Sequence, residues 1–392
     1  MRKCRSSWDF STCGYPAPEI PEPGVSETSA RAGVRENGVP LGSWCHGRHG
    51  RGRHYCRNTG GEGLRAVKPA TASCNVDTAR SGPGPPGSRG GVGSPLSPRD
   101  SQDELRGKVI WVTGASSGIG EELLSQLSKI GALLAISARR EDELEREKKK
   151  CLEISNLSEK DILVLRLDLT DRSSHEAATN SVLKHFGKID VLVNNGGRSQ
   201  RSLFVDTNLD VYSAIMELNY LGTISLTKYV LNHMIERKRG KIITVSSVMG
   251  LMGAPLASGY CASKHALQGF FNSLRTELTD YPEINITVIC PGPVQSQIIQ
   301  NVFTENLAKP LEKSGDQSHK MPTDRCVRLT LVSMANDLKE AWVSDQPYLA
   351  ICYLWQYAPT WAWWLMNKLA KKRIQNFKSG VDADVSYSRK KK

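Results

Sequence analysis

The chain has 392 residues, and 39% of them are hydrophobic, which is enough to bury a large core. Its net charge of +12 lies mainly in the two ends, because residues 1–100 carry 14 Lys or Arg against 8 Asp or Glu and residues 368–392 carry 9 against 2. Residues 101–367 are therefore about neutral, so no nucleic-acid partner is expected for this part of the chain. A basic Arg/Gly tail that binds nucleic acid is an alternative that rests on charge alone.

Composition changes at about residue 104. Residues 1–104 are rich in Gly, Pro, Arg and Ser without apolar periodicity, which predicts a disordered basic extension. The start of the chain has the charges of a signal peptide but lacks its apolar run. The ten cysteines form no C-x-x-C pair, which favours reduced thiols. One cluster in this region offers zinc ligands at a spacing that matches no finger pattern, so no metal is predicted: Cys45, His46, His49, His54 and Cys56.

From Lys108 onward, short apolar runs alternate with longer amphipathic runs, which is typical of βαβ units around a parallel sheet. Strands are expected at 108–115, 133–140, 161–169, 190–195, 241–247, 286–291 and 341–345. The predicted fold class is α/β, a doubly wound, Rossmann-like parallel sheet of about seven strands in a domain at 105–310. Residues 311–392 are expected to form a substrate lid and helices at a membrane interface.

The first expected strand runs into the turn "TGASSGIG", Thr113–Gly120, and then into an amphipathic helix. This context predicts a dinucleotide site: Gly114 allows a tight turn, Gly118 lets the backbone approach a pyrophosphate, and Gly120 lets the helix pack on the sheet. The helix N-terminus adds donors and partial positive charge. The other predicted cofactor contacts of this turn are Thr113, Ser116, Ser117 and Ile119. The alternative is a glycine-rich turn that binds no ligand.

Polar residues also follow the next strands. The second expected strand ends in Arg139 and Arg140, where a carboxylate would bind the ribose 2′-hydroxyl of NAD, so NADP(H) is favoured over NAD(H). The alternative is that both arginines are solvated residues at a helix start. Carboxyl ends of parallel strands are where open α/β sheets bind ligands, which predicts further cofactor contacts at the ends of the third and fourth strands: Asp168, Asn195 and Gly196.

The stretch "GYCASKHAL" places Tyr260 four residues before Lys264, on one face of an expected helix. A free phenol has a pKa of about 10, and a neighbouring ammonium stabilises the phenolate and lowers that pKa. These residues predict Tyr260 as the general acid or base and Lys264 as the modulator of its pKa and a ribose ligand. Ser247 would position a substrate carbonyl, and Asn219 would hold a water that links Lys264 to solvent. The alternative is a surface pair without chemistry.

These motifs together resemble the short-chain dehydrogenase/reductase family. The matching features are "TGASSGIG", "NNGG" in place of the usual NNAG, Asn219, Ser247 thirteen residues before Tyr260, "YCASK" as the Y-x-x-x-K box, and "PGPVQS". The resemblance covers 108 to about 308. It implies that Pro291, Val294 and Ser296 border the nicotinamide of the cofactor, and that homo-oligomers are a possible assembly.

A narrower resemblance, within the same family, is carried by "NNGGRSQRSL", "HMIERKRGKI", "GDQSHKM" and "YLWQYAPTWAWW". It implies a reductase that uses NADPH on lipophilic carbonyls such as steroids, retinoids and xenobiotic ketones, attached to the endoplasmic reticulum membrane. The segment Gln346–Asn367 contains no charged side chain, and its tryptophans, tyrosines and prolines favour helices at a membrane interface or along an apolar channel over a membrane span. A catalytically silent dinucleotide-binding scaffold is the alternative function.

Overall fold

A computed structural model describes residues 103–309 and 317–380 of the chain. Both ranges belong to one compact unit, Gly87–Lys392. Residues 1–102, with the Cys/His cluster of the expected extension, lie outside the described residues. Among the residues described, no group of three or more His, Cys, Asp or Glu side chains could hold a metal ion.

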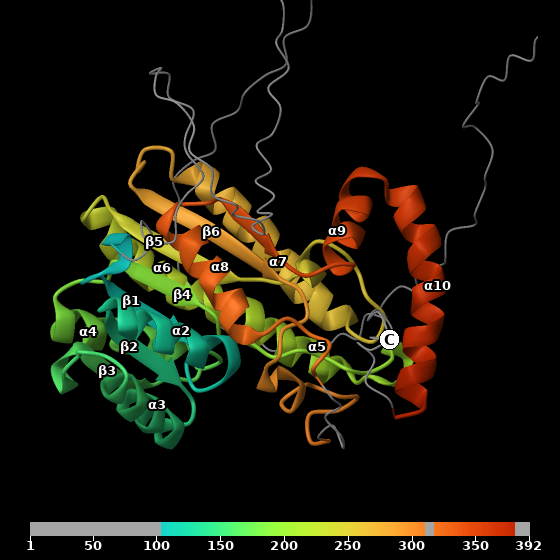
Figure 1. Cartoon of the computed structure of the whole chain (residues 1–392), viewed down its shortest axis with the longest axis horizontal. Coiled ribbons are helices and arrows are strands. Elements are labelled where there is room, and N and C mark those ends of the chain that lie inside the picture. The colour runs from blue at the N-terminus through green and yellow to red at the C-terminus, as the bar shows by residue number, and fades with distance from the viewer. Residues whose placement is uncertain (1–102, 310–316, 381–392) are drawn as a thin grey trace, which may run out of the picture. The chain divides into compact units, whose positions relative to one another are not determined.

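The described unit contains a parallel sheet of seven strands in the order β3-β2-β1-β4-β5-β6-β7 (Figure 1), which confirms the predicted fold class. The strands are β1 Val109–Thr113, β2 Leu133–Ala138, β3 Ile162–Arg166, β4 Val191–Asn194, β5 Gly240–Val245, β6 Ile284–Pro291 and β7 Glu340–Val343. Strand β7 pairs with β6 in parallel, so the sheet is completed by residues that follow the expected domain boundary at 310.

Helices cover both faces of the sheet. Successive side chains of a strand point to opposite faces, and apolar side chains on each face are buried under helices. In β1, Trp111 packs in one core cluster while Ile110 and Val112 pack in the other. The helices are α2 Gly118–Ile130, α3 Glu141–Glu153, α4 His175–Phe186, α5 Leu209–Met216, α6 Gly222–Glu236, α7 Ser258–Glu277, α8 Thr323–Ala335, α9 Tyr348–Tyr357 and α10 Pro359–Lys378. Helices α2, α3 and α8 contribute to the cluster of Ile110, and α4, α6 and α7 to the cluster of Trp111.

The strand order reverses between β1 and β4, which are neighbours although about eighty residues separate them. From β1 the chain continues to β2 on one side, and from β4 it continues to β5 on the other side. The loops that leave the carboxyl ends of β1 and β4 therefore diverge and leave a crevice between them. The predicted cofactor residues follow these strand ends.

Two further elements bear on the site. A π-helical turn, Glu217–Leu221, joins α5 to α6 and contains Asn219. Helices α9 and α10 pack against each other at the end of the chain that follows β7 (Figure 1). No helix within residues 103–309 and 317–380 has the length and apolar character needed to cross a membrane. The five cysteines in these ranges are buried free thiols, as expected.

Candidate active site

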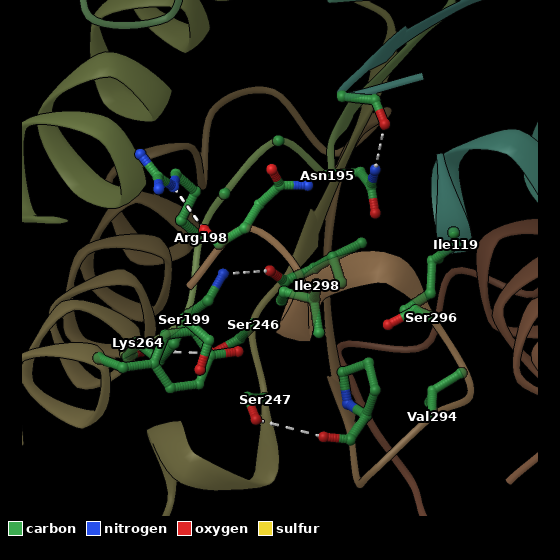
Figure 2. Close-up of a pocket in the computed structure, with 18 of the residues that line it drawn as sticks. Ile119, Asn195, Arg198, Ser199, Ser246, Ser247, Lys264, Val294, Ser296 and Ile298 are labelled. Atoms are coloured by element: carbon green, nitrogen blue, oxygen red, sulfur yellow. Dashed lines mark hydrogen bonds between the residues drawn. The ribbon is translucent and has the colours of Figure 1, made fainter. Parts of the chain in front are cut away.

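A cavity of about 360 Å³ opens at the carboxyl ends of the strands. Of the predicted cofactor, substrate and catalytic residues, all except Gly120 and Asn219 line its wall. Lys264 and Ser247 lie on one side of this cavity, and Ile119, Val294 and Ser296 lie on the other (Figure 2). The fold therefore brings residues from six different strand ends to one place.

The turn after β1 is held by the neighbouring strand β4. The Thr113 hydroxyl oxygen accepts hydrogen bonds from the backbone N–H groups of Asn195 (3.0 Å) and Gly196 (3.1 Å). Gly114 has a φ of 62°, a conformation that favours glycine, and a Cβ there would lie 2.7 Å from the Cα of Gly196. At Gly120 a Cβ would lie 2.2 Å from the carbonyl oxygen of Gly114, so the glycine is needed for the close approach of helix and turn.

The N-terminus of α2 points its first backbone donors at this crevice. The helix starts at Gly118, and its N-cap residue Ser117 has an extended backbone. The first four N–H groups of any helix lack partners within the helix, and they carry partial positive charge. Such an end fits a phosphate group, and together with the close-packed glycine turn it fits the pyrophosphate of a dinucleotide.

The end of the crevice beside β2 carries two cationic side chains. Arg139 and Arg140 follow β2 and are both exposed, and both line the cavity. Arg140 lies 3.8 Å from Glu143 of the helix that follows. Asp168, after β3, uses one carboxylate oxygen to accept hydrogen bonds from the backbone N–H (3.0 Å) and the hydroxyl (2.9 Å) of Thr170.

Ser247, Tyr260 and Lys264 line the same cavity as the glycine turn. The Ser247 hydroxyl donates to the Pro291 carbonyl (3.3 Å) and accepts from the Met249 backbone N–H (3.1 Å), which fixes it at the end of β5. Lys264 Nζ donates to the Val245 carbonyl at 2.9 Å and lies 5.7 Å from the centre of the Tyr260 ring. The i,i+4 spacing therefore brings phenol and ammonium onto one wall, as predicted.

Burial determines how these groups titrate. Burial raises the pKa of Tyr260 to about 12, although a hydrogen bond with Ser247 and the charge of Arg201 act in the opposite direction. Burial also lowers the pKa of Lys264 to about 8. The sequence predicts that the charge of Lys264 lowers the pKa of the phenol. In the protein alone, the effect of burial is larger and the pKa is raised instead. At neutral pH Tyr260 is therefore held in the protonated form that a proton donor requires.

Asn219 lies behind the catalytic wall and does not line the cavity. Its amide oxygen accepts from the Arg198 backbone N–H (2.9 Å), and its amide nitrogen donates to the Arg198 carbonyl (2.9 Å) and to the Ser263 hydroxyl (3.0 Å). A π-helical turn, a feature frequent at functional sites, turns this side chain inward. These contacts place Asn219 next to the helix of Tyr260, and the water-relay role stays a prediction.

Several further cavity residues were not singled out one by one from the sequence, because only tertiary packing brings them to the site. The C-terminal helices contribute Tyr348 and Ile351 from α9 and Met366 and Arg373 from α10. The loop after β4 contributes Arg198, Ser199 and Arg201, and Arg198 Nε donates to the Asn301 carbonyl at 2.6 Å. The stretch "RSQRS" lies directly after "NNGG", and its adjacency to that motif is the signal that could have identified it.

Known proteins are similar to this chain in sequence and in fold. A family model described as short chain dehydrogenase matches residues 108–307. The human protein "Dehydrogenase/reductase SDR family member 7" is 68% identical over 284 residues, which cover 72% of this chain and 84% of that protein. An Anopheles gambiae protein, "Dehydrogenase/reductase SDR family protein 7-like", is 38% identical over 269 residues, covering 68% of this chain and 84% of its own length.

Solved structures show the likeness of the fold. The crystal structure of a short-chain dehydrogenase/reductase from Burkholderia phymatum, in complex with NAD, superposes with a TM-score of 0.57 at 22% identity, covering 64% of this chain and 93% of that chain. At this identity the likeness concerns the fold alone. The family model and the two relatives show more: the chain belongs to the short-chain dehydrogenase/reductase family of oxidoreductases.

Proposed function

We propose that this oxidoreductase reduces the carbonyl group of lipophilic compounds with NADPH, and that Tyr260 donates the proton. The observation that carries the proposal is that Ser247, Tyr260 and Lys264 line the same cavity as the Thr113–Gly120 turn. A bound nicotinamide dinucleotide supplies the hydride that adds to the carbonyl carbon. The Ser247 hydroxyl rotates away from the Pro291 carbonyl, to which it donates in this structure, and donates its one hydrogen bond to the substrate carbonyl oxygen instead. Tyr260 Oη transfers its proton to that oxygen as hydride addition gives it alkoxide character. The Lys264 ammonium stabilises the phenolate that remains.

The preference for lipophilic substrates is supported by the substrate end of the cavity. A small hydrophobic cluster there joins Val248 and Met252, from the loop after β5, to Ile351 of α9 and Met366 of α10. Methionine side chains adapt to irregular apolar ligands. Steroid ketones, retinal and xenobiotic ketones are the substrates that follow from the resemblance within the family.

The test of this function is NADPH oxidation at 340 nm by the full chain, with retinal, steroid ketones and an aromatic diketone, and with a charged small ketone as the polar comparison. Turnover of at least one lipophilic ketone, with weaker turnover of the charged one, is the expected result. Tight cofactor binding without turnover of any carbonyl compound would favour the alternative of a silent dinucleotide-binding scaffold.

We further propose that Arg139 and Arg140 bind the 2′-phosphate of NADPH. Both lie at the end of β2, beside the predicted ribose site, and both are exposed, so a phosphate can reach them. The double variant Arg139→Ala/Arg140→Ala should weaken NADPH binding by about tenfold or more, and NADH binding should change little, because charge-assisted hydrogen bonds to the phosphate are lost. Lys149→Ala removes an exposed charge farther along α3 and is the control. Equal losses of NADPH and NADH affinity, measured by fluorescence titration, would contradict the assignment.

We also propose that α9 and α10 contact a membrane surface. The resemblance within the family implies that this membrane is that of the endoplasmic reticulum. Trp361, Trp363 and Trp364 are 67%, 57% and 57% exposed, and Lys368 Nζ lies 3.8 Å from the centre of the Trp364 ring. Exposed tryptophans beside lysines are typical of helices that lie at a membrane interface. The same helices line the cavity through Ile351 and Met366, so an apolar substrate would enter from the lipid.

The double variant Trp361→Ser/Trp364→Ser should reduce cosedimentation of the full chain with phosphatidylcholine vesicles that contain anionic lipid. Its control is Val205→Ser, which removes an apolar side chain that is 84% exposed outside α9 and α10. If the double variant binds the vesicles as well as the wild type does, α10 does not contact the membrane.

A further inference from the structure

Tyr260 stands in the first turn of its helix, at an end that has to find hydrogen-bond acceptors elsewhere. Helix α7 begins at Ser258, and its N-cap residue is Ala257, whose methyl side chain cannot accept a hydrogen bond. Ala257 and Gly259 are buried, and Tyr260 is 8% exposed, so water is a poor substitute. The N–H groups of the second and third helical positions, Gly259 and Tyr260, are the ones that an N-cap side chain normally satisfies.

A glutamine from another loop takes the place of the missing cap. The side-chain oxygen of Gln200, Oε1, accepts a hydrogen bond from the Gly259 N–H at 2.7 Å and from the Tyr260 N–H at 3.4 Å. Gln200 is 0% exposed, and its Nε2 donates to the Ser202 hydroxyl at 3.1 Å, which fixes the orientation of the amide. We propose that Gln200 is a positioning residue of this active site, which sets the place of Tyr260 by capping the catalytic helix.

The segment that carries Gln200 is held on both sides. Two backbone hydrogen bonds join it to the loop after β6: Phe303 N–H donates to the Ser199 carbonyl (2.9 Å), and Arg201 N–H donates to the Phe303 carbonyl (2.8 Å). Asn219 holds both polar groups of the Arg198 backbone at 2.9 Å. Figure 2 shows Arg198 and Ser199 on the side of the cavity where Lys264 lies. The cap is therefore a fixed part of the site.

The same segment connects the cofactor side to the proton donor. It follows the "NNGG" stretch, whose Asn195 and Gly196 hold the turn after β1. At the other side of Tyr260, the Ser263 hydroxyl donates to the Tyr260 carbonyl at 2.8 Å and accepts from the Asn219 amide at 3.0 Å. Gln200 and Asn219 thus hold the two backbone polar groups of Tyr260, one directly and one through Ser263. A shift of this turn would move the phenol relative to the carbonyl oxygen, and a misplacement of about 1 Å can cost about 100-fold in rate.

The first test measures amide exchange and needs no turnover, so it is independent of the proposed function. Gln200→Met keeps the size of the side chain and removes both polar ends. It should increase hydrogen exchange at the Gly259 and Tyr260 amides by about tenfold or more, while amides in the middle of α7 stay protected. Gln200→Glu keeps the acceptor oxygen and should restore protection. Unchanged exchange in Gln200→Met overturns the proposal.

The second test measures kinetics and rests on the proposed reductase activity. In Gln200→Met, kcat should fall by about 10-fold to 100-fold, with the Kd for NADPH within about twofold of the wild type, and Gln200→Glu should recover most of kcat. Gln268→Met removes another buried amide of α7 and should keep kcat within about twofold. If Gln200→Met is less thermally stable but its kcat per folded molecule is unchanged, Gln200 supports the fold and does not position Tyr260.

Two results keep the outcomes apart. If the wild type shows no carbonyl turnover but Gln200→Met still shows faster exchange at the two amides, the proposed function is wrong and the cap is retained. If Gln200→Met does not fold, Ser202→Ala is the milder variant, because it removes the hydroxyl that orients the Gln200 amide. Exchange at the two amides should then rise by a smaller factor, and exchange equal to the wild type overturns the cap.

Discussion

Tyr260→Phe should lower kcat for carbonyl reduction by about 100-fold to 10,000-fold, since general acid catalysis by a positioned side chain contributes on that order. The change removes one oxygen atom from a buried ring, so the fold and the packing of α7 should persist. The Kd for NADPH should rise by less than about tenfold, because the substitution leaves in place the Thr113–Gly120 turn and the arginines after β2 that we propose as the contacts with the phosphates. Steady-state kinetics and fluorescence titration of the same preparation measure the two effects separately.

The control for this variant is Tyr281→Phe, which makes the same chemical change in the turn between α7 and β6, away from the cavity. Its kcat should equal that of the wild type. A Tyr260→Phe variant that keeps more than a tenth of wild-type kcat would falsify Tyr260 as the proton donor.

Lys264→Met should lower kcat by about 100-fold and at the same time make the protein more stable at neutral pH. The catalytic loss follows from removing the cation that stabilises the phenolate of Tyr260. The gain in stability follows from the pKa of Lys264, which burial lowers from 10.5 to about 8. The folded protein binds this proton more weakly than the unfolded chain does, so the charged lysine costs roughly 3 kcal/mol of folding free energy at pH 7.

The sign of this effect gives a measurable pH dependence. Between about pH 8 and pH 10.5 the unfolded chain binds more protons at Lys264 than the folded protein does, so the wild type gains stability from this group as the pH rises. The advantage of Lys264→Met in thermal melting should therefore shrink from pH 7 to pH 10. Wild-type kcat should decline above about pH 8 as the ammonium is lost. A variant that is less stable than the wild type at both pH values would show that the hydrogen bond to the Val245 carbonyl outweighs desolvation.

Local patterns made the main parts of the site predictable. The glycine turn is defined by three glycines between a strand and a helix, and Tyr260 and Lys264 share a face because they are four residues apart. Ser247 was predicted as a site residue because it lies at the end of an expected strand. In each case the neighbours in sequence are also the neighbours in space, so periodicity and turn chemistry were sufficient.

The rest depends on contacts between distant segments. Gln200 caps a helix that begins 58 residues later, and this partnership has no counterpart in helix-capping motifs, where the cap is local. Met366 and Arg373 reach the cavity because α10 packs back over it. The direction of the pKa shift of Tyr260 was also hidden, since charge neighbours can be read from spacing but the extent of burial cannot.

The hydroxyl of Thr113, which joins the ends of β1 and β4, has a consequence for synthesis of the chain on the ribosome. The turn after β1 is translated first, but the amides that hold its start belong to Asn195 and Gly196, about eighty residues later. Contacts of such long sequence separation form late, after loop closure, and folding during synthesis proceeds from the N-terminal side. The hydrogen bonds from Asn195 and Gly196 to the Thr113 hydroxyl can therefore form only once β4 has left the exit tunnel, and until then β1 has β2 but not β4 as a neighbouring strand.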